Sequence, residues 1–398
     1  MDKNNKARYI MFTIAFSILL LTNGFQVKAS ISSINIESEA ALLMDAKSGQ
    51  IIFGKNEKIS MYPASITKIA TAIYALENTN LDEIVEISEE ATDVDGTKVY
   101  LVPGEKVTVE KLLIGIIMNS GNDAAFALAE HIDGTMENFE KNINEFLTET
   151  IGVEHTHFVN PHGLFDENHY TTVEDMAEIT RYALQNDSFR NIFQMKEYDW
   201  DGEGWDTTLI THHRLLKGEY PYEGITGGKN GFVNESGYTL VTTAERDSLQ
   251  LIVVTMKTNL KNVPYTDTIQ LLDYGFENFE TRKIEQDTVF ETEEGRFIAK
   301  EDLYFTINKE HTYVTQVTND GFLSIIDENT KNTLTQFSLT LEDIQTVEME
   351  EAVASEVDET KADSSMHLLI GSFVSLFIIL AIFIWQSDKP RGRFFRKM

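Results

Sequence analysis

Three short polar segments, far apart in the chain, carry residue types that work together. Ser65-Ile66-Thr67-Lys68 places a serine and a lysine three residues apart, and Ser120-Gly121-Asn122 and Lys229-Asn230-Gly231 add a second hydroxyl and a second lysine. The S-x-x-K spacing alone occurs by chance in many helices, so its weight comes from the order and context of the other two segments. A fold that uses all three must bring them to one place.

The first segment predicts a nucleophile and its base. Ser65 opens an apolar, helix-compatible stretch, where free backbone N–H groups and the positive end of the helix dipole favour an oxyanion. Lys68 lies on the same helix face, within reach of the hydroxyl. Burial among Ile66, Ile69 and Ile73, with a second cation nearby, is expected to lower the lysine pKa enough for it to accept a proton. A helix cap followed by a solvated lysine is the alternative for this segment.

The other two segments predict the remaining parts of a catalytic site. Ser120 and Asn122 lie in a polar break between two apolar helices, where the hydroxyl can relay a proton to a leaving amine. The Asn122 amide can hold a substrate backbone while donating to Lys68 or Ser65. Lys229 lies in a glycine-rich stretch and presents a point charge suited to a carboxylate. By themselves, these segments also fit a helix cap and a hairpin turn with an exposed lysine.

Composition excludes several classes of protein. The 398 residues can form more than one domain, and 33 Lys and Arg against 64 Asp and Glu give a net charge of −31. This charge argues against a nucleic-acid partner, which proteins hold by neutralising phosphates. The chain has no cysteine, so disulfides, thiolate metal sites and a cysteine nucleophile are excluded.

The two ends of the chain predict export and membrane attachment. Residues 1–29 have the layout of a signal peptide, with an uncleaved N-terminal anchor as the alternative. Residues 366–386 contain an uncharged apolar run, Leu368 to Trp385, which predicts a transmembrane helix rather than an amphipathic surface helix. Because residues 387–398 are basic, we expect this tail in the cytoplasm and everything before the span outside the membrane.

Between these ends, the patterns predict an α+β catalytic domain over residues 30–280. Residues 40–44 and 50–53 flank a turn signal and predict a hairpin, whereas late strands are expected at 238–243 and 249–256. Apolar stretches predict helices over residues 66–76, 112–118 and 124–132. This order indicates one sheet built from both ends of the domain, with a helical subdomain inserted.

Two further segments separate this domain from the predicted span. Residues 281–343 contain short alternating runs divided by polar turns, which predict a small all-β domain. Residues 344–365 are rich in acidic side chains and predict a solvated linker.

These motifs resemble those of the low-molecular-mass penicillin-binding proteins of the serine D-alanyl-D-alanine carboxypeptidase family. The resemblance extends over roughly Glu39 to Glu280, with a small β domain and a C-terminal membrane attachment beyond it. The matching runs are Ala41-Leu42-Leu43-Met44-Asp45-Ala46-Lys47-Ser48-Gly49, Pro63-Ala64-Ser65-Ile66-Thr67-Lys68, Ser120-Gly121-Asn122-Asp123-Ala124-Ala125, Asn160-Pro161-His162-Gly163-Leu164, Gly228-Lys229-Asn230-Gly231-Phe232 and Glu235-Ser236-Gly237-Tyr238.

The resemblance implies a penicilloyl-serine transferase fold, of the β-lactamase and transpeptidase type, with an antiparallel sheet and a helical subdomain. It implies that Ser65 is acylated, that Lys68 accepts its proton, and that Ser120 with Asn122 forms the second catalytic element. Lys229 would bind the terminal carboxylate of the substrate, beside Asn230 and Gly231. Asn230 departs from the family pattern, which has threonine there, and this departure is expected to alter activity or β-lactam affinity.

The resemblance predicts the removal of terminal D-alanine from peptidoglycan pentapeptide stems at the cell wall, with β-lactams as covalent inhibitors. No cofactor or metal is expected, although a site at His155, His157 and His169 is a conceivable alternative to loop and packing roles. A β-lactamase is the alternative within the same chemistry. A β-lactam sensor or wall-binding protein without turnover is the alternative outside it. The sequence does not indicate an oligomeric state.

Overall fold

The computed structural model describes residues 34–342. The predicted signal peptide, acidic linker, transmembrane helix and basic tail lie outside the described residues. Within residues 34–342, none of the helices combines the length and the apolar composition that crossing a bilayer requires.

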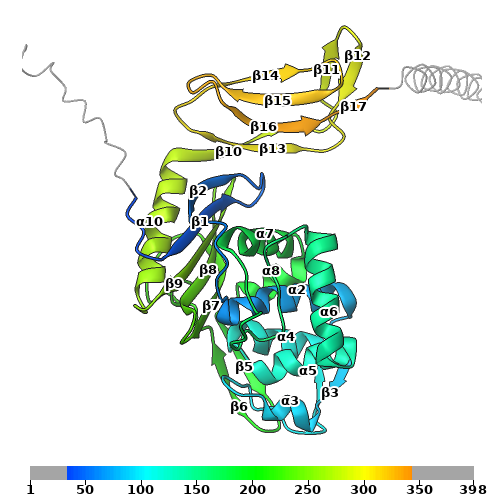
Figure 1. The fold of residues 1–398 in the computed structure, drawn as a ribbon, viewed down its shortest axis with the longest axis vertical. Helices are drawn as coiled ribbons and strands as arrows, with labels where there is room; N and C mark the ends of the chain where they lie inside the picture. The colour runs from blue at the N-terminus through cyan, green and yellow to red at the C-terminus, as the bar shows by residue number, and fades with distance from the viewer. Residues whose placement is uncertain (1–33, 343–398) are drawn as a thin grey trace, which may run out of the picture. The chain divides into compact units, whose positions relative to one another are not determined.

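A five-stranded antiparallel sheet forms the centre of the first part of the chain (Figure 1). Its strand order is β2-β1-β9-β8-β7, so strands from the two ends of this part lie side by side, as the sequence predicts. The predicted hairpin and the adjacent late strands are both confirmed. The strands are β1 (Ala40–Asp45), β2 (Ile51–Lys55), β7 (Ile225–Val233), β8 (Gly237–Arg246) and β9 (Leu249–Thr258).

The two faces of this sheet pack against different helices. On β1, Leu42 and Met44 belong to the large core shared with the helical subdomain. Leu43, pointing the other way, packs in a second core with residues of α10 (Val263–Asn278). Figure 1 shows the helical subdomain on one side of the sheet and α10 on the other. Because both faces are covered, the central strands are almost continuously apolar and buried.

The helical subdomain lies between β2 and β7 in the chain. Side-chain caps set several helix starts: Thr108 and Thr172, for example, accept hydrogen bonds from the backbone N–H groups of Lys111 and Asp175. Its helices are the 3₁₀ helix η1 (Ala64–Thr67), α2 (Lys68–Asn78), α3 (Glu89–Asp93), α4 (Val109–Met118), α5 (Asn122–Asp133), α6 (Met136–Glu145), the π-helix η2 (Phe146–Ile151), α7 (Val173–Ala183), α8 (Asp187–Phe193) and α9 (Arg214–Lys217). Two small hairpins accompany them, β3 (Ile84–Glu86) with β4 (Lys106–Thr108) and β5 (Glu197–Asp201) with β6 (Asp206–Ile210).

From Phe279 to Leu341, the regular elements of the described chain are all strands, as the alternating runs predict. The strands are β10 (Phe279–Ile284), β11 (Val289–Thr292), β12 (Gly295–Ile298), β13 (Leu303–Asn308), β14 (Tyr313–Val317), β15 (Phe322–Asp327), β16 (Thr333–Ser338) and β17 (Thr340–Leu341). The chain divides into two compact units, and the segment 304–312 belongs to the first unit together with the residues up to 283.

A buried carboxylate is one of the links between the segment 304–312 and the rest of the first unit. Asp45, at the end of β1, is fully buried and accepts hydrogen bonds from the hydroxyls of Thr281 (2.7 Å) and Thr306 (2.8 Å). Its other oxygen accepts a bond from the backbone N–H of Lys47 (3.0 Å). The turn after β1 is therefore tied to strands β10 and β13 by bonds to one charged group, which are stronger than bonds between neutral groups.

Candidate active site

Ser65 and Lys68 lie where the short 3₁₀ helix η1 runs into α2. Lys68 Nζ is 3.2 Å from Ser65 Oγ, the reach that the three-residue spacing predicts. The serine is only partly buried, whereas the lysine is completely buried. The hydroxyl can therefore meet a substrate from outside while its proton acceptor stays away from water.

Two further oxygens hold the Lys68 amine in place. Nζ donates to Asn122 Oδ1 (2.7 Å) and to the backbone carbonyl of His162 (2.6 Å). The expectation that the Asn122 amide donates to Lys68 is wrong, because its Nδ2 group instead donates to the carbonyl of Asp95 (2.7 Å). The asparagine therefore orients the lysine as an acceptor and anchors the loop at Asp95.

The environment of Lys68 disfavours its charged form. Burial lowers the pKa of Lys68 well below its ordinary value, and the positive charge of Lys229 lowers it further. The carboxylate of Asp123 acts in the opposite direction, but it is the smallest of the three effects. Lys229 is thus the second cation that the sequence leads us to expect, and a neutral Lys68 can accept the proton of Ser65.

Ser120 and Lys229 form a second pair. Lys229 is buried within β7, so the glycine-rich stretch is an edge strand of the sheet rather than the alternative hairpin turn with an exposed lysine. Its Nζ donates to Ser120 Oγ (3.1 Å) and to the backbone carbonyl of Asn230 (2.9 Å). Burial lowers the pKa of Lys229 to about 7. The Ser120 hydroxyl therefore accepts a hydrogen bond from the Lys229 amine, and this amine loses its charge near neutral pH.

Gly231 brings β7 close to the nucleophile. A Cβ atom at this position would lie 2.7 Å from the backbone nitrogen of Ser65 and 2.5 Å from Thr239 Oγ1, too close for any other residue. Thr239, on the neighbouring strand β8, in turn donates to the carbonyl of Pro63 (2.8 Å), which fixes β8 against η1. The backbone N–H of Ser65 and the β7 edge can therefore face the same substrate carbonyl.

The backbone is strained next to both hydroxyls. Ala64, just before Ser65, has a φ of 51°, and Ser120 itself has a φ of 61°. Left-handed conformations are uncommon for residues other than glycine, and they cluster at functional sites. Strain at these two positions supports the idea that Ser65 and Ser120 are held for chemistry.

Sequence reasoning missed two contributors to the site. The His162 carbonyl that binds Lys68 is a backbone atom, so no side-chain pattern could reveal it. Asp123 is fully buried and accepts bonds from the backbone N–H groups of Val99 (3.0 Å) and Leu101 (3.2 Å). It thereby fastens the loop over the Ser120 turn. The position of Asp123 directly after Asn122 is the sequence feature that could have indicated its contribution to the site.

Comparison with known proteins identifies the family. The family model for D-alanyl-D-alanine carboxypeptidases matches residues 26–259, more than half of the chain. The chain belongs to the D-alanyl-D-alanine carboxypeptidase family. This match confirms the predicted serine carboxypeptidase of the penicillin-binding type.

Individual relatives agree with this identification. The carboxypeptidase is 31% identical over 287 residues to D-alanyl-D-alanine carboxypeptidase DacF of Bacillus subtilis, covering 69% of this chain and 72% of that protein. It is 31% identical over 291 residues to DacA of Haemophilus influenzae, covering 68% of each chain. The structure of penicillin-binding protein 5 from Haemophilus influenzae superposes with a TM-score of 0.70 at 26% identity, covering 79% of this chain and 99% of that one.

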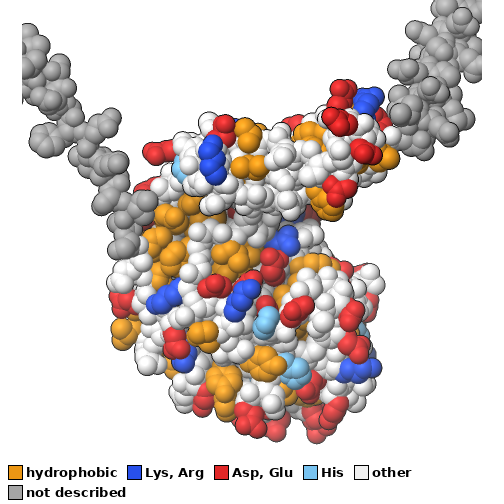
Figure 2. All heavy atoms as spheres, turned by 45° about the horizontal axis from the view of Figure 1, so that its top comes forward, with side chains coloured by type: hydrophobic (Ala, Val, Ile, Leu, Met, Phe, Trp, Pro, Cys, Tyr) orange, Lys and Arg blue, Asp and Glu red, His pale blue; other side chains and the backbone are white. Residues whose placement is uncertain are grey.

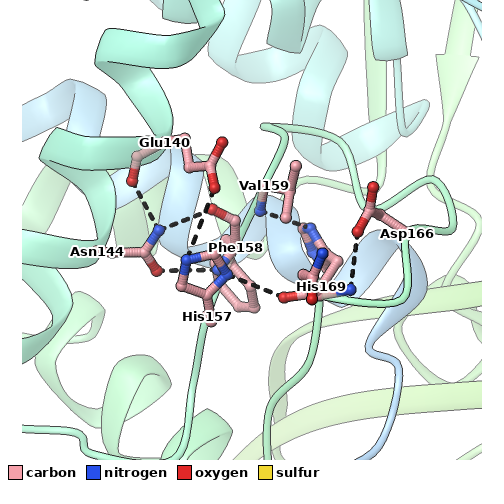
Figure 3. A network of polar contacts seen from close by, with 8 residues as sticks. Glu140, Asn144, His157, Phe158, Val159, Asp166 and His169 are labelled. Carbon is pink, nitrogen blue, oxygen red and sulfur yellow. Dashed lines mark hydrogen bonds and ion pairs between the residues drawn. The ribbon is translucent and has the colours of Figure 1, made fainter.

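Two histidines of the conceivable metal site, His157 and His169, make contacts with other protein groups (Figure 3). His169 lies between Thr67 Oγ1 (2.9 Å) and the backbone N–H of Val159 (3.1 Å), and burial lowers its pKa to about 3. His157 Nε2 is 3.7 Å from a carboxylate oxygen of Glu140. Within residues 34–342, no group of three or more His, Cys, Asp or Glu side chains could hold a metal ion.

Burial of Lys229 predicts that the carboxypeptidase becomes more stable as the pH rises above 7. Lys229 has a pKa of about 7 when folded, against roughly 10.4 in an unfolded chain. Below pH 7 the folded protein contains the buried charge of Lys229, which lowers the free energy of unfolding. This destabilisation decreases as the pH rises from 7 toward 10.4. Between the two values only the unfolded chain holds the proton, so the free energy of unfolding should rise by about 1.4 kcal/mol per pH unit.

Urea unfolding of the wild type and of Lys229→Met between pH 7.5 and 9.5 tests this expectation. The difference in unfolding free energy between the two proteins should change with the predicted slope, because only the wild type contains Lys229. Above its folded pKa of about 7, Lys229 no longer carries the charge that acts on Lys68, so the titration of Lys68 is similar in both proteins. Parallel pH curves would show that Lys229 is not neutralised by folding.

Proposed function

We propose that this carboxypeptidase removes the terminal D-alanine from peptidoglycan pentapeptide stems through an acyl-enzyme on Ser65. The observation that carries the proposal is the 3.2 Å contact between Ser65 Oγ and the buried amine of Lys68. A serine with a neutral amine at this distance needs no histidine to become a nucleophile. Penicillin, which contains a reactive amide, would acylate the same oxygen.

In the first half of the reaction, Lys68 takes the proton of Ser65. Ser65 Oγ attacks the carbonyl carbon of the penultimate D-alanine, and the carbonyl oxygen becomes an oxyanion. Backbone N–H groups stabilise this charge, including that of Ser65 beside Gly231. Asn122 and Asn230 contribute polar contacts to the substrate, and Lys229 contributes positive charge near its terminal carboxylate.

In the second half, the peptide bond breaks and its nitrogen leaves as the amine of free D-alanine. Ser120 gives this nitrogen a proton, and Lys229, which donates to Ser120 Oγ, replaces it. Water then attacks the ester on Ser65: its hydroxyl joins the shortened stem, and its other hydrogen restores the Ser65 hydroxyl. The proton that Lys68 took from Ser65 passes back to Lys229, which returns both lysines to their starting states.

The place of the reaction follows from the chain ends. A signal peptide over residues 1–29 would export the protein, and a helix over residues 366–386 would hold it in the cell membrane. The catalytic residues would then face the cell wall, where the pentapeptide stems are.

One experiment separates the proposal from its alternatives. The full-length protein is incubated with a peptide ending in D-alanyl-D-alanine and, separately, with a fluorescent penicillin. Release of D-alanine together with a long-lived adduct on Ser65 is the expected result. Rapid turnover of penicillin would indicate a β-lactamase, and an adduct without release of D-alanine would indicate a sensor. A protein that forms no adduct on Ser65 would overturn the acyl-enzyme mechanism.

A further inference from the structure

His169 is a buried histidine close to η1 that takes no part in the proposed proton transfers. Charged side chains are spread over the molecular surface seen in Figure 2, whereas His169 is only 2% exposed. Its ring stacks on that of Phe158, with 4.8 Å between the ring centres. A buried polar ring needs hydrogen-bond partners, and both nitrogens of His169 have one.

These two partners decide which nitrogen of His169 carries the hydrogen. Nδ1 accepts a hydrogen bond from the backbone N–H of Val159 (3.1 Å), so it carries no hydrogen itself (Figure 3). A neutral imidazole then has its hydrogen on Nε2, which lies 2.9 Å from Thr67 Oγ1 and donates to it. Burial lowers the pKa of His169 to about 3, which keeps the ring neutral and this arrangement intact at neutral pH.

Thr67 connects His169 to the turn before the nucleophile. Thr67 is fully buried, and its hydroxyl donates its own hydrogen to the carbonyl of Ala64 (2.8 Å). The hydrogen bonds therefore run in one direction, from Val159 through His169 and Thr67 to Ala64. Bonds in such a chain polarise and strengthen one another.

The Ala64 carbonyl and the Ser65 N–H belong to the same peptide unit. A peptide unit is planar and trans, so its C=O and N–H point in opposite directions. Thr67 binds the oxygen of this unit, and Gly231 lies near its nitrogen, because a Cβ atom on Gly231 would be 2.7 Å from the Ser65 nitrogen. A bond that fixes the carbonyl therefore also fixes the direction of the N–H, which stabilises the oxyanion in the proposed reaction.

This peptide unit follows a strained residue and needs to be held. Ala64 has a φ of 51°, a left-handed conformation that persists in residues other than glycine only where surrounding contacts maintain it. Gly163 packs so closely against the Ala64 carbonyl that a Cβ atom there would overlap its oxygen. Packing thus limits where the oxygen can move, and the Thr67 hydroxyl supplies the hydrogen bond that holds it.

We propose that His169 is a positioning residue for acylation: through Thr67 and the Ala64 carbonyl, it aims the Ser65 N–H at the carbonyl oxygen of the substrate. The inference rests on the proposed function and adds a residue that supports the oxyanion site by acting through Thr67. It also gives one histidine of the conceivable metal site a role as a hydrogen-bond donor.

Two substitutions of His169 separate positioning from packing. His169→Phe keeps a ring against Phe158 but removes both hydrogen bonds, whereas His169→Gln loses the ring but keeps an N–H group that can donate to Thr67. Positioning predicts that the phenylalanine variant is the slower of the two, and packing alone predicts the reverse order. At the other end of the contact, Thr67→Val removes the hydroxyl and Thr67→Ser keeps it.

Thr242→Val is the matched control. Thr242 is also fully buried, and its Oγ1 is 2.9 Å from Nε2 of His213, whose Nδ1 likewise accepts a backbone N–H. Thr242 pairs with Gly228 in the sheet, so its side chain lies on the opposite face from that of the neighbouring Lys229. The control therefore breaks the same kind of contact at a similar depth, away from the turn before the nucleophile.

Each full-length variant is mixed with a fluorescent penicillin over a range of concentrations. The rate constant of Ser65 acylation at saturation and the half-saturating concentration are obtained separately, and the final amount of adduct counts the folded, active molecules. We expect His169→Phe and Thr67→Val each to lower the rate constant about tenfold, less than the ~10²–10³ that the loss of an oxyanion donor costs. The half-saturating concentration should stay close to that of the wild type, Thr67→Ser should restore the rate, and Thr242→Val should leave it unchanged.

The double variant that combines Thr67→Val with His169→Phe should be no slower than either single variant, because both residues act through one contact. A roughly hundredfold loss, the product of the two single effects, would show that they act independently and would overturn the inference. Three other results would also overturn it: a wild-type rate constant in His169→Phe, a glutamine variant slower than the phenylalanine variant, or a tenfold loss in Thr242→Val.

If His169→Phe does not fold, His169→Gln decides the question. It should slow the wild type roughly threefold and leave Thr67→Val unchanged, since that variant has already lost the contact. Equal slowing of both would contradict the inference. A wild type that forms no adduct on Ser65 would instead overturn the proposed function, so the two failures are distinguishable.

Discussion

Replacing Lys68 with methionine is expected to slow the acylation of Ser65 by roughly a thousandfold, within the range that a positioned general base contributes. Methionine fills a similar volume but cannot accept a proton. Burial keeps water from taking over this role, because Lys68 is completely enclosed. The measurement is the rate at which a fluorescent penicillin labels Ser65, followed by mass spectrometry of the labelled peptide.

Lys58→Met is the control for this experiment, since Lys58 precedes the same helix but points into solvent. Its labelling rate should equal that of the wild type. Thermal unfolding should confirm that both variants are folded. If Lys68→Met labels as fast as the control, another group must activate Ser65.

Gly163→Ala should combine a large loss of stability with a large loss of acylation. Gly163 has a φ of 80°, and a Cβ atom there would overlap the backbone carbonyl of Ala64 and approach Thr67 Oγ1 to 2.9 Å. The left-handed conformation costs alanine about 1 to 2 kcal/mol, and the overlap adds about 1 to 3 kcal/mol. Because Ala64 directly precedes Ser65, any relief of the overlap must move the nucleophile, and a shift of ~1 Å can cost a hundredfold in rate.

Gly152→Ala separates these two effects. Gly152 ends the π-helix η2 with a φ of 86°, but nothing lies within 4 Å of the position that its Cβ would occupy. This variant should lose only the conformational part of the stability and should keep the acylation rate of the wild type. Chemical unfolding and penicillin labelling measure the two quantities. Equal losses in the two variants would show that the loop at Gly163 can move without disturbing Ser65.

The residues that could be predicted from the sequence are those whose geometry is local. The reach of Lys68 to Ser65 depends on helix geometry alone, and the break before Asn122 depends on a change of pattern between two helices. The hairpin after β1 is equally local, because its turn residues lie between its two strands.

The remaining contacts depend on segments that meet only in the fold. Asn122 accepts a hydrogen bond from Lys68 through its amide oxygen, because its amide nitrogen donates to the carbonyl of Asp95 in a distant loop. The His162 carbonyl reaches Lys68 because Gly163 lets that loop pack against η1. Likewise, the pairing of Glu219 with Arg214 and Lys217 follows from the packing around α9.

The hydrogen bonds from Thr281 and Thr306 to Asp45 make strand β1, at the start of the first compact unit, dependent on residues at the end of that unit. A polypeptide that stops before Thr281 would leave one oxygen of a buried charge without either hydroxyl donor, which carries a substantial desolvation penalty. Asp45 and Thr306 are 261 residues apart in the chain, so their hydrogen bond forms only after the segments that carry β1 and β13 have met. Contacts between such distant parts of a chain form slowly, so the first compact unit should complete its folding only when residues 304–312 have joined it.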